Sequence, residues 1–250
     1  MTGKLRAIVR EPGDSFVHAL SHHPDRESID PELARRQHSE FRRLLESLGV
    51  SLTELAPSEE FPDACFTADV AVVVDGRALV TRTGALSRRG EANSVEGLLT
   101  NAEHMESPAT LEGGDVLNFG GSLVVGLSER TNAAGVERLT KFAGIPVATA
   151  DVPEGVLHLG TASSALGPNA LIGIKDIVES DAFADMERLI VPEAEAVAAN
   201  VIVLGKQVIA AKGHRGTRRL LEDRSFTVNE VDLSEFAKAD GGPSCLALFF

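Results

Sequence analysis

VAVVVDGRALVTR, residues 70–82, places two runs of mostly apolar and β-branched residues on either side of an Asp-Gly pair. An Asp-Gly pair between such runs is typical of a two-residue β-hairpin turn. The same organisation recurs in DVLNFGGSLVVGL (115–127), SSALGPNALIGI (163–174) and NVIVLGKQVIAA (200–211). The sequence therefore predicts four hairpins that begin 37 to 48 residues apart, a spacing that indicates an internal repeat.

The two ends of the chain supply a fifth hairpin. KLRAIVR (4–10) and CLALFF (245–250) are each strand-like, and each lacks a partner strand next to it in the sequence. Pairing the two would close the set of hairpins into a ring.

A helix and a third strand are expected after each hairpin. Helical spacing of apolar residues predicts helices over Leu33–Leu48, Glu91–Leu99, Thr131–Phe142, Ala182–Leu189 and Gly216–Leu221. The third strands are VSLTEL (50–55), HMES (104–107), IPVATA (145–150), RLIVP (188–192) and SFTVNEVD (225–232). This repeat predicts an α/β fold, a five-bladed α/β propeller of ββαβ units with pseudo-fivefold symmetry, in one catalytic domain over residues 1–250. An ordinary mixed α/β sheet has the same alternation and stays open as the alternative.

Composition narrows the classes of function. The 250 residues include 24 Lys and Arg against 37 Asp and Glu, a net charge of −13. The electrostatic field of a negatively charged protein does not attract polyanions, so we expect no nucleic-acid partner and a small cationic ligand instead. There is no apolar run of about 18 residues and no secretory signal at the start, so we expect a cytoplasmic protein without a membrane partner. The sequence does not decide between a monomer and a homodimer.

Reactive side chains stand directly before the hairpins. Asp63 and Asp69 precede the first hairpin, Glu112 the second and His158 the third, and Cys245 opens the strand that completes the fifth. Equivalent positions of a closed ring meet at its centre. We therefore expect an acid, a base and a nucleophile to converge on one site.

Cys245 follows the turn-forming segment DGGPS (240–244), which suits a nucleophile presented at the start of a strand. A lone cysteine is more often a small buried apolar residue, and a histidine flanked by leucines, as His158 is, is often a core residue. Their shared place in the repeat favours catalysis, with His158 as proton donor and acceptor. The other histidines, His38 among them, are expected to be solvated.

The converging carboxylates imply a cationic ligand. A planar guanidinium offers five N–H donors in a fixed fork that carboxylates match. Arg88 and Arg130 each follow a hairpin and are either surface residues or a clamp for a carboxylate of the ligand. For Asp115, a structural role as a turn cap and a functional role are equally supported.

Seven segments of the chain together resemble one known family, the dimethylarginine dimethylaminohydrolases, within the guanidino-group-modifying superfamily that includes arginine deiminases. The segments are FPDACFTAD (61–69), TRTGALSRRGE (81–91), LEGGDVL (111–117), VGLSERTN (125–132), VLHL (156–159), AANVI (198–202) and DGGPSCLAL (240–248). They occur in the family's order over nearly the whole chain.

The resemblance implies a role for each site residue and a site with no metal and no organic cofactor. It makes Cys245 the nucleophile, His158 the acid and base, and Glu112 the residue that orients His158. It assigns the guanidinium to Asp69, the α-ammonium to Asp63 and the backbone of Leu20, and the α-carboxylate to Arg88 and Arg130. The loop from Val17 to Asp30 resembles the family's mobile lid.

The implied reaction is hydrolysis of a methylated arginine to citrulline and methylamine or dimethylamine through a covalent thiouronium on Cys245. The chain departs from the family at Ala68, because the family usually has two acids in a row where this chain has Ala68-Asp69. The departure leaves open arginine, monomethylated arginine and other ω-substituted guanidino compounds as substrates. Arginine deiminase activity, transfer of the amidino group to an amine, and simple binding of cationic amino acids are the alternatives.

Overall fold

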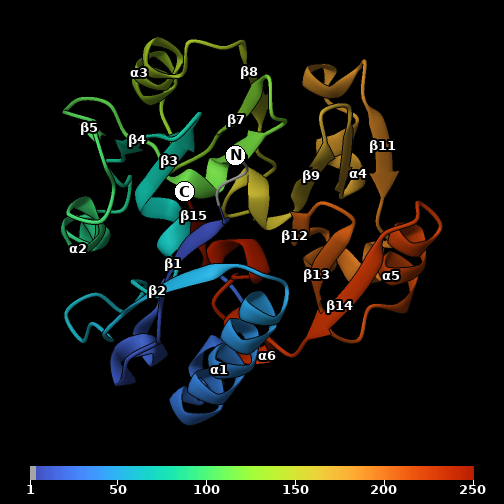
Figure 1. Ribbon diagram of the computed structural model, residues 1–250, viewed down its shortest axis with the longest axis horizontal. Helices are drawn as coiled ribbons and strands as arrows, with labels where there is room; N and C mark the ends of the chain where they lie inside the picture. The colour runs from blue at the N-terminus through green and yellow to red at the C-terminus, as the bar shows by residue number, and fades with distance from the viewer. Residues whose placement is uncertain (1–3) are drawn as a thin grey trace.

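Five three-stranded sheets form a ring in the computed structural model, which describes residues 4–250 (Figure 1). Every sheet contains an antiparallel hairpin, and its middle strand also pairs with a parallel third strand. The first strand of each sheet lies nearest the centre of the ring and the helices lie at its periphery. The predicted five-bladed α/β propeller is confirmed.

Four of the sheets are continuous in the chain and follow the predicted hairpins. They contain β3 (Ala71–Val74), β4 (Arg77–Val80) and β5 (Glu103–His104); β6 (Val116–Asn118), β7 (Leu123–Leu127) and β8 (Val147–Asp151); β9 (Ser163–Gly167), β10 (Ala170–Gly173) and β11 (Glu187–Ile190); β12 (Val201–Leu204), β13 (Gln207–Ala211) and β14 (Thr227–Val231). In the β3–β4 turn, Asp75 and Gly76 have φ angles of 50° and 73°. Positive φ at both central residues is what the favoured hairpin turn needs, and Asp-Gly adopts it readily.

The fifth sheet joins the two ends of the chain. It contains β1 (Arg6–Arg10), β2 (Ser51–Leu55) and β15 (Leu248–Phe249). β1 pairs antiparallel with β15, with Ala7 opposite Phe249, and parallel with β2. The predicted closure of the ring by the terminal strands is confirmed, and it places the segment before β15 at the centre.

The helices are α1 (Pro31–Ser47), α2 (Asn93–Glu96), α3 (Ala133–Ala143), α4 (Lys175–Val178), α5 (Arg215–Glu222) and α6 (Ser234–Ala237). α1 begins where the Asp30 side chain accepts hydrogen bonds from the backbone N–H groups of Glu32 and Leu33. The helix predicted over Ala182–Leu189 is wrong, because residues 187–190 form β11 against β10 and the helical turn lies earlier, at α4. The third strand predicted over 188–192 corresponds to β11, and the predicted helix extended into it.

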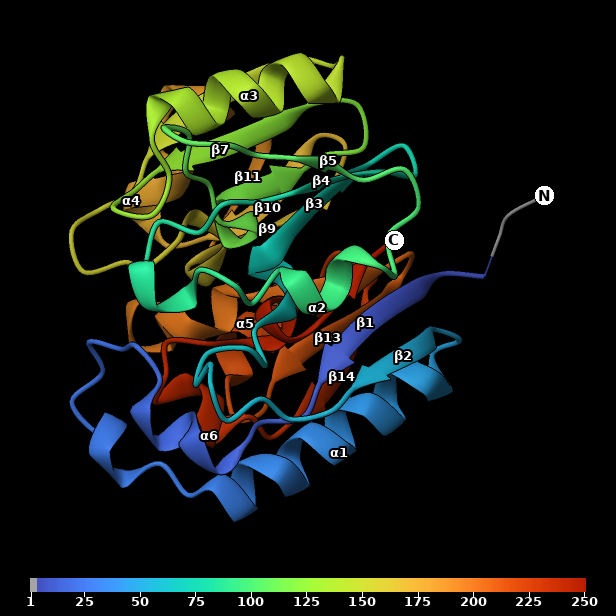
Figure 2. The same cartoon turned by 90° about the vertical axis from the view of Figure 1, so that its left-hand side faces the viewer.

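The hydrophobic core is divided among the gaps between neighbouring sheets and helices. In the cluster beneath α1, Phe16 packs 5.3 Å from Phe236 and 6.0 Å from Phe66, measured between ring centroids. α1 packs against β2, β14 and α6, and the side view shows it running alongside β2 (Figure 2). His38 on α1 is fully buried beside Phe236, which corrects the expectation that it is solvated, and burial lowers its pKa to about 3. The apolar packing lies around the ring and leaves polar residues at its centre.

Candidate active site

A short 3₁₀ turn precedes the first strand of each sheet and holds the central residues. Asp69 lies in the turn Thr67–Val70, and Cys245 lies in the turn Pro243–Leu246. Glu112 and His158 are the residues immediately before the turns Gly113–Asp115 and Leu159–Thr161. The repeat therefore delivers these four side chains to one place, although they are far apart in the sequence.

One cavity at this place is lined by most of the predicted site residues: Leu20, Asp63, Asp69, Arg88, Arg130, His158 and Cys245. Its volume is ≈ 10 Å³, which is about the space that one water molecule needs. Glu112 is not among the lining residues and is fully buried behind His158. We refer to this space as the central cavity.

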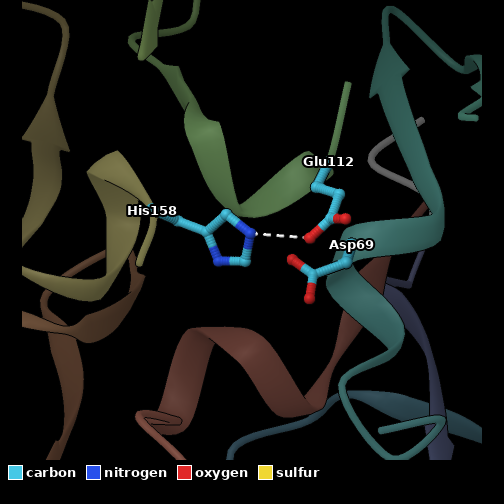
Figure 3. Close-up of side chains that lie close together, drawn as sticks. All are labelled: Asp69, Glu112 and His158. Atoms are coloured by element: carbon cyan, nitrogen blue, oxygen red, sulfur yellow. Dashed lines mark hydrogen bonds and ion pairs between the residues drawn. The ribbon is translucent and has the colours of Figure 1, made fainter. Parts of the chain in front are cut away.

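His158 and Glu112 form a buried pair in which Nε2 lies 2.7 Å from Oε2 (Figure 3). Burial opposes a charge on His158, but the carboxylates of Asp69, Glu112 and Asp115 outweigh it and raise the His158 pKa to about 9. Burial likewise opposes a charge on Glu112, but His158, Arg88 and Arg130 hold the Glu112 pKa well below its usual range. The pair is therefore an imidazolium and a carboxylate at neutral pH, so His158 can act as a proton donor.

Cys245 is 8% exposed, and its sulfur faces two N–H donors. Asn200 Nδ2 lies 3.4 Å and Gly242 N 3.5 Å from Sγ. Burial and the charge of Asp69 raise the pKa of the thiol to about 11, against the opposing hydrogen bonds of Gly242, Asn200 and Ser244. The free thiol is therefore protonated at neutral pH, and a cation beside it would favour the thiolate.

Asn200 is a site residue that the reasoning from sequence missed. It is 1% exposed and is held on both sides, since Nδ2 also donates to Gly160 O at 2.9 Å and Oδ1 accepts from Ser244 N at 2.9 Å. Asn200 stands directly before β12 and after the 3₁₀ turn Glu193–Ala199, whereas Glu112 and His158 stand before their turns. Its place at the start of the fourth predicted hairpin was the signal that could have identified it.

The Arg88 guanidinium is surrounded by protein carboxylates. Its Nε and Nη2 donate to Glu91, at 3.0 and 2.8 Å, and Nη1 donates to Asp69 Oδ2 at 2.7 Å and to Glu112 Oε2 at 3.4 Å. Nη2 also lies 3.5 Å from the carbonyl oxygen of Asp63. Every donor of the guanidinium is thereby directed at a protein oxygen, so Arg88 occupies Asp69 Oδ2 in this structure.

Asp63 and Arg130 both line the central cavity. Asp63 Oδ1 accepts from Leu20 N at 3.0 Å, which brings the loop 17–30 against the site. Arg130 Nη1 lies 3.7 Å from Glu112 Oε1, and the Arg130 side chain is 14% exposed. Arg130 is thus the arginine of the site with free access to a ligand.

Asp115 connects three parts of the site without lining the cavity. Its Oδ1 accepts from Leu159 N at 2.9 Å, next to His158. Its Oδ2 accepts from Ser128 Oγ at 2.6 Å and from Thr131 Oγ1 at 2.7 Å. These two hydroxyls accept hydrogen bonds from the backbone N–H groups of Arg130 and Glu112, so the structural role weighed for Asp115 is the one its contacts support.

Asp69, Glu112 and His158 are the one grouping in residues 4–250 whose side chains could hold a metal ion, with one ligand atom from each within 4.8 Å of the others. Arg88 Nη1 already lies against two of these three ligands. A metal ion would have to displace that cation, so the donor set suits a guanidinium better than a metal.

The model of the family described as N,N dimethylarginine dimethylhydrolase, eukaryotic, matches residues 13–242. The chain belongs to the dimethylarginine dimethylaminohydrolase family. A family member from Streptomyces coelicolor, an N(G),N(G)-dimethylarginine dimethylaminohydrolase, is 35% identical over 97% of this chain and 96% of its own length.

Two solved structures of dimethylarginine dimethylaminohydrolases superpose closely on the chain. One is a cysteine-to-serine mutant from Pseudomonas aeruginosa in complex with citrulline, with a TM-score of 0.94, 33% identity and 99% of each chain covered. The other is a histidine-to-glycine variant in an adduct with S-methyl-L-thiocitrulline, with a TM-score of 0.94, 33% identity, and 99% of this chain and 100% of that chain covered. Membership of the family agrees with the resemblance found in the sequence.

No helix in the described range 4–250 combines the length and the apolar character that crossing a bilayer requires. Both cysteines, Cys65 and Cys245, are unpaired.

Proposed function

We propose that this chain hydrolyses the guanidinium group of methylated L-arginine to citrulline and methylamine or dimethylamine, with Cys245 as nucleophile. The observation that carries the proposal is that Cys245, His158 and Asp69 line one cavity. The citrulline complex and the thiocitrulline adduct of its relatives support the product and the covalent chemistry. With two unpaired cysteines, we place the enzyme in the cytoplasm.

Substrate binding begins with an exchange of guanidinium groups. Arg88 Nη1 holds Asp69 Oδ2 in the structure, so the substrate guanidinium takes that oxygen as Arg88 moves away. Arg88 keeps Glu91 as its bidentate partner and gains donors for the substrate α-carboxylate, together with Arg130. Asp63 and the backbone of Leu20 bind the α-ammonium. The ligand thereby replaces each buried charge contact that it breaks.

The cationic guanidinium then activates the thiol. Its positive charge next to Sγ lowers the Cys245 pKa, and the N–H groups of Asn200 and Gly242 stabilise the thiolate that forms when the proton leaves to solvent. His158 is already protonated and so does not accept that proton. The thiolate attacks the planar carbon and a C–S bond forms, giving a tetrahedral adduct.

His158 completes both halves of the reaction. Its Nε2 is held by Glu112, whereas Nδ1 makes no hydrogen bond to the described residues and is left to donate its proton to the departing nitrogen. The C–N bond breaks, the neutral amine leaves, and a thiouronium remains on Cys245. The neutral His158 then takes a proton from water, and the hydroxide adds to the carbon. The C–S bond breaks with the thiolate as leaving group, and the hydroxyl proton passes to that thiolate as citrulline is released. A positioned proton shuttle contributes roughly 10²–10⁴-fold to such a step.

Substitution of the nucleophile tests the proposal. Cys245→Ser is expected to fold normally and to release no citrulline from monomethyl- or asymmetric dimethyl-L-arginine, whereas Cys65→Ala, at the other buried thiol, should retain turnover. Citrulline and the released amine are both quantified, with L-arginine as a third substrate so that ammonia release is detected. Turnover by Cys245→Ser equal to that of the unchanged enzyme would falsify the role of the thiol.

A further inference from the structure

Asp240 attaches the loop 17–30 to the segment that carries the nucleophile. Asp240 Oδ2 accepts a hydrogen bond from His22 N at 2.9 Å and another from Ser21 Oγ at 2.8 Å. Asp240 begins the segment DGGPS that leads directly to Cys245, and both residues line the central cavity. One short stretch of chain therefore fixes the position of the loop and that of the sulfur.

The backbone of Asp240 is itself fixed at the end of α6. Asp240 N donates to Ala237 O at 3.1 Å and Gly241 N donates to Phe236 O at 2.9 Å, while Asp240 has a φ of 53°. These two hydrogen bonds around a left-handed residue form a Schellman motif, a common way to end a helix. A Cβ at Gly241 would stand 2.3 Å from the Phe66 ring, so the glycine lets this turn pack closely on the core. The Asp240 carboxylate is thus presented to the loop from a fixed turn.

The far end of the loop is attached to the same part of the chain. Lys238 Nζ donates to Ser28 O at 2.9 Å, and Glu235 Oε2 accepts from Asp30 N at 2.8 Å. Lys238 Nζ also donates to Glu235 Oε2 at 2.9 Å, so an ion pair joins these two contacts. The loop 17–30 is therefore held at two places by α6 and the residues that follow it.

Leu20 lies next to both acids that hold the loop at the central cavity. Asp63 Oδ1 accepts from Leu20 N at 3.0 Å, and Asp240 holds the two residues that follow Leu20. In the proposed function Asp63 also binds the substrate α-ammonium, whose N–H groups compete with Leu20 N for the same carboxylate. The hydrogen bonds of Asp240 Oδ2 do not depend on Asp63, so they hold this part of the loop while the substrate is bound.

We propose that Asp240 is a positioning residue, which holds the backbone of Leu20 where the substrate α-ammonium binds by anchoring Ser21 and His22. The inference rests on the proposed function, in which Asp63 and the backbone of Leu20 bind that ammonium. Asp240 acts through the loop and takes no part in breaking the C–N bond. Its loss therefore weakens the binding of substrates that carry an α-ammonium and leaves the chemical step unchanged.

Asp240→Gly tests the inference, because glycine removes the carboxylate and adopts the left-handed backbone without strain. Asp75→Gly is the matched control, since Asp75 has a φ of 50° in the exposed turn between β3 and β4. Two hydrogen bonds to a carboxylate are lost in Asp240→Gly, so we expect KM for Nω-methyl-L-arginine to rise about tenfold or more, with kcat changed less than about threefold. Asp75→Gly should change neither constant. Asp240→Asn keeps one acceptor oxygen for His22 N and should restore most of the lost affinity.

A compound without the α-ammonium separates positioning from general damage to the site. 5-(N′-methylguanidino)pentanoic acid is measured as a competitive inhibitor of Nω-methyl-L-arginine hydrolysis. Its inhibition constant should change less than about threefold in Asp240→Gly, because it has no ammonium for Leu20 and Asp63 to bind. An inhibition constant that rises as much as KM does overturns the inference.

Hydrogen exchange of the peptide that contains residues 17–30 reports the attachment itself. Exchange in the free enzyme should be faster in Asp240→Gly than in the unchanged protein and unaltered in Asp75→Gly. Ser21→Ala removes one donor from the loop side and gives the same test, with a smaller rise of about threefold in KM, should Asp240→Gly be insoluble. Unaltered exchange, or a KM that stays at the unchanged value, overturns the inference and leaves the proposed function intact. Absence of citrulline from the unchanged enzyme refutes the proposed function, and the inference with it.

Discussion

The reactivity of Cys245 in the free enzyme is set by burial and the charge of Asp69, which raise the thiol pKa, and by the hydrogen bonds that oppose them, and it can be measured directly. With a pKa of about 11, about one thiol in a thousand is ionised at pH 8, and the rate of alkylation should rise about tenfold for each pH unit up to that value. Asn200→Ala removes the donor that lies 3.4 Å from Sγ. A hydrogen bond to a charged group contributes about 1.5 kcal/mol, and one pKa unit corresponds to about 1.4 kcal/mol. The substitution should therefore raise the thiol pKa by about one unit.

The assay is iodoacetamide labelling as a function of pH, followed at the Cys245 peptide by mass spectrometry. At any pH below the thiol pKa, Asn200→Ala should label about tenfold more slowly than the unchanged protein. Asn169→Ala, an exposed asparagine in the β9–β10 turn, is the matched control and should change nothing. The Cys65 peptide reports unfolding, because that thiol is 2% exposed. Equal labelling of Cys245 in both variants, or a plateau already reached near neutral pH, would refute the role given to Asn200.

Three further predictions concern the charged residues of the site. Arg130→Ala should raise KM for methylated arginine by about tenfold with little change in kcat, because Arg130 is proposed to bind the substrate rather than to react. Arg138→Ala, at the ion pair with Glu103 on α3, should leave both constants unchanged. An unaltered KM in Arg130→Ala contradicts the proposed binding of the substrate α-carboxylate by Arg130. Arg88→Met leaves the buried carboxylates of Asp69 and Glu91 without their ion-pair partner and should lower the free energy of unfolding in urea by about 3–5 kcal/mol, against little for Arg138→Met. A loss below about 1 kcal/mol contradicts this. The pKa of His158 is raised from 6.5 to about 9, so the folded state holds the His158 proton more tightly than the unfolded state does. The free energy of folding that this contributes is complete below pH 6.5 and is lost as the pH rises through 9. Urea unfolding between pH 6 and pH 9 should show that loss, and a His158→Gln variant should show a smaller one. The pKa of Glu112 is lowered, so its contribution is complete above its unfolded value near 4.5 and is lost at lower pH.

The hairpins and the ring could be derived from the amino-acid sequence, because their signals are local. Asp75-Gly76 needs only its own backbone preferences to predict a turn, and alternating turn and β-branched residues recur at a countable spacing. The convergence of Glu112, His158 and Cys245 then followed from symmetry alone. Asn200 opens the fourth predicted hairpin, but its contact with Cys245 Sγ became evident only in the folded chain.

What only the tertiary structure decided were contacts between elements that no local pattern encodes. The helix predicted over 182–189 overlaps the strand predicted over 188–192, and the strand prevails as β11 because β10 supplies hydrogen-bond partners from outside the segment. His38 looked like a solvated helix residue until Phe236, nearly two hundred residues later in the chain, covered it. The pairing of Arg88 with Glu91 and Asp69 likewise depends on how the five sheets pack. Burial and charge pairing at the centre of a closed ring arise from many segments at once, and for that reason they could be known only from the folded chain.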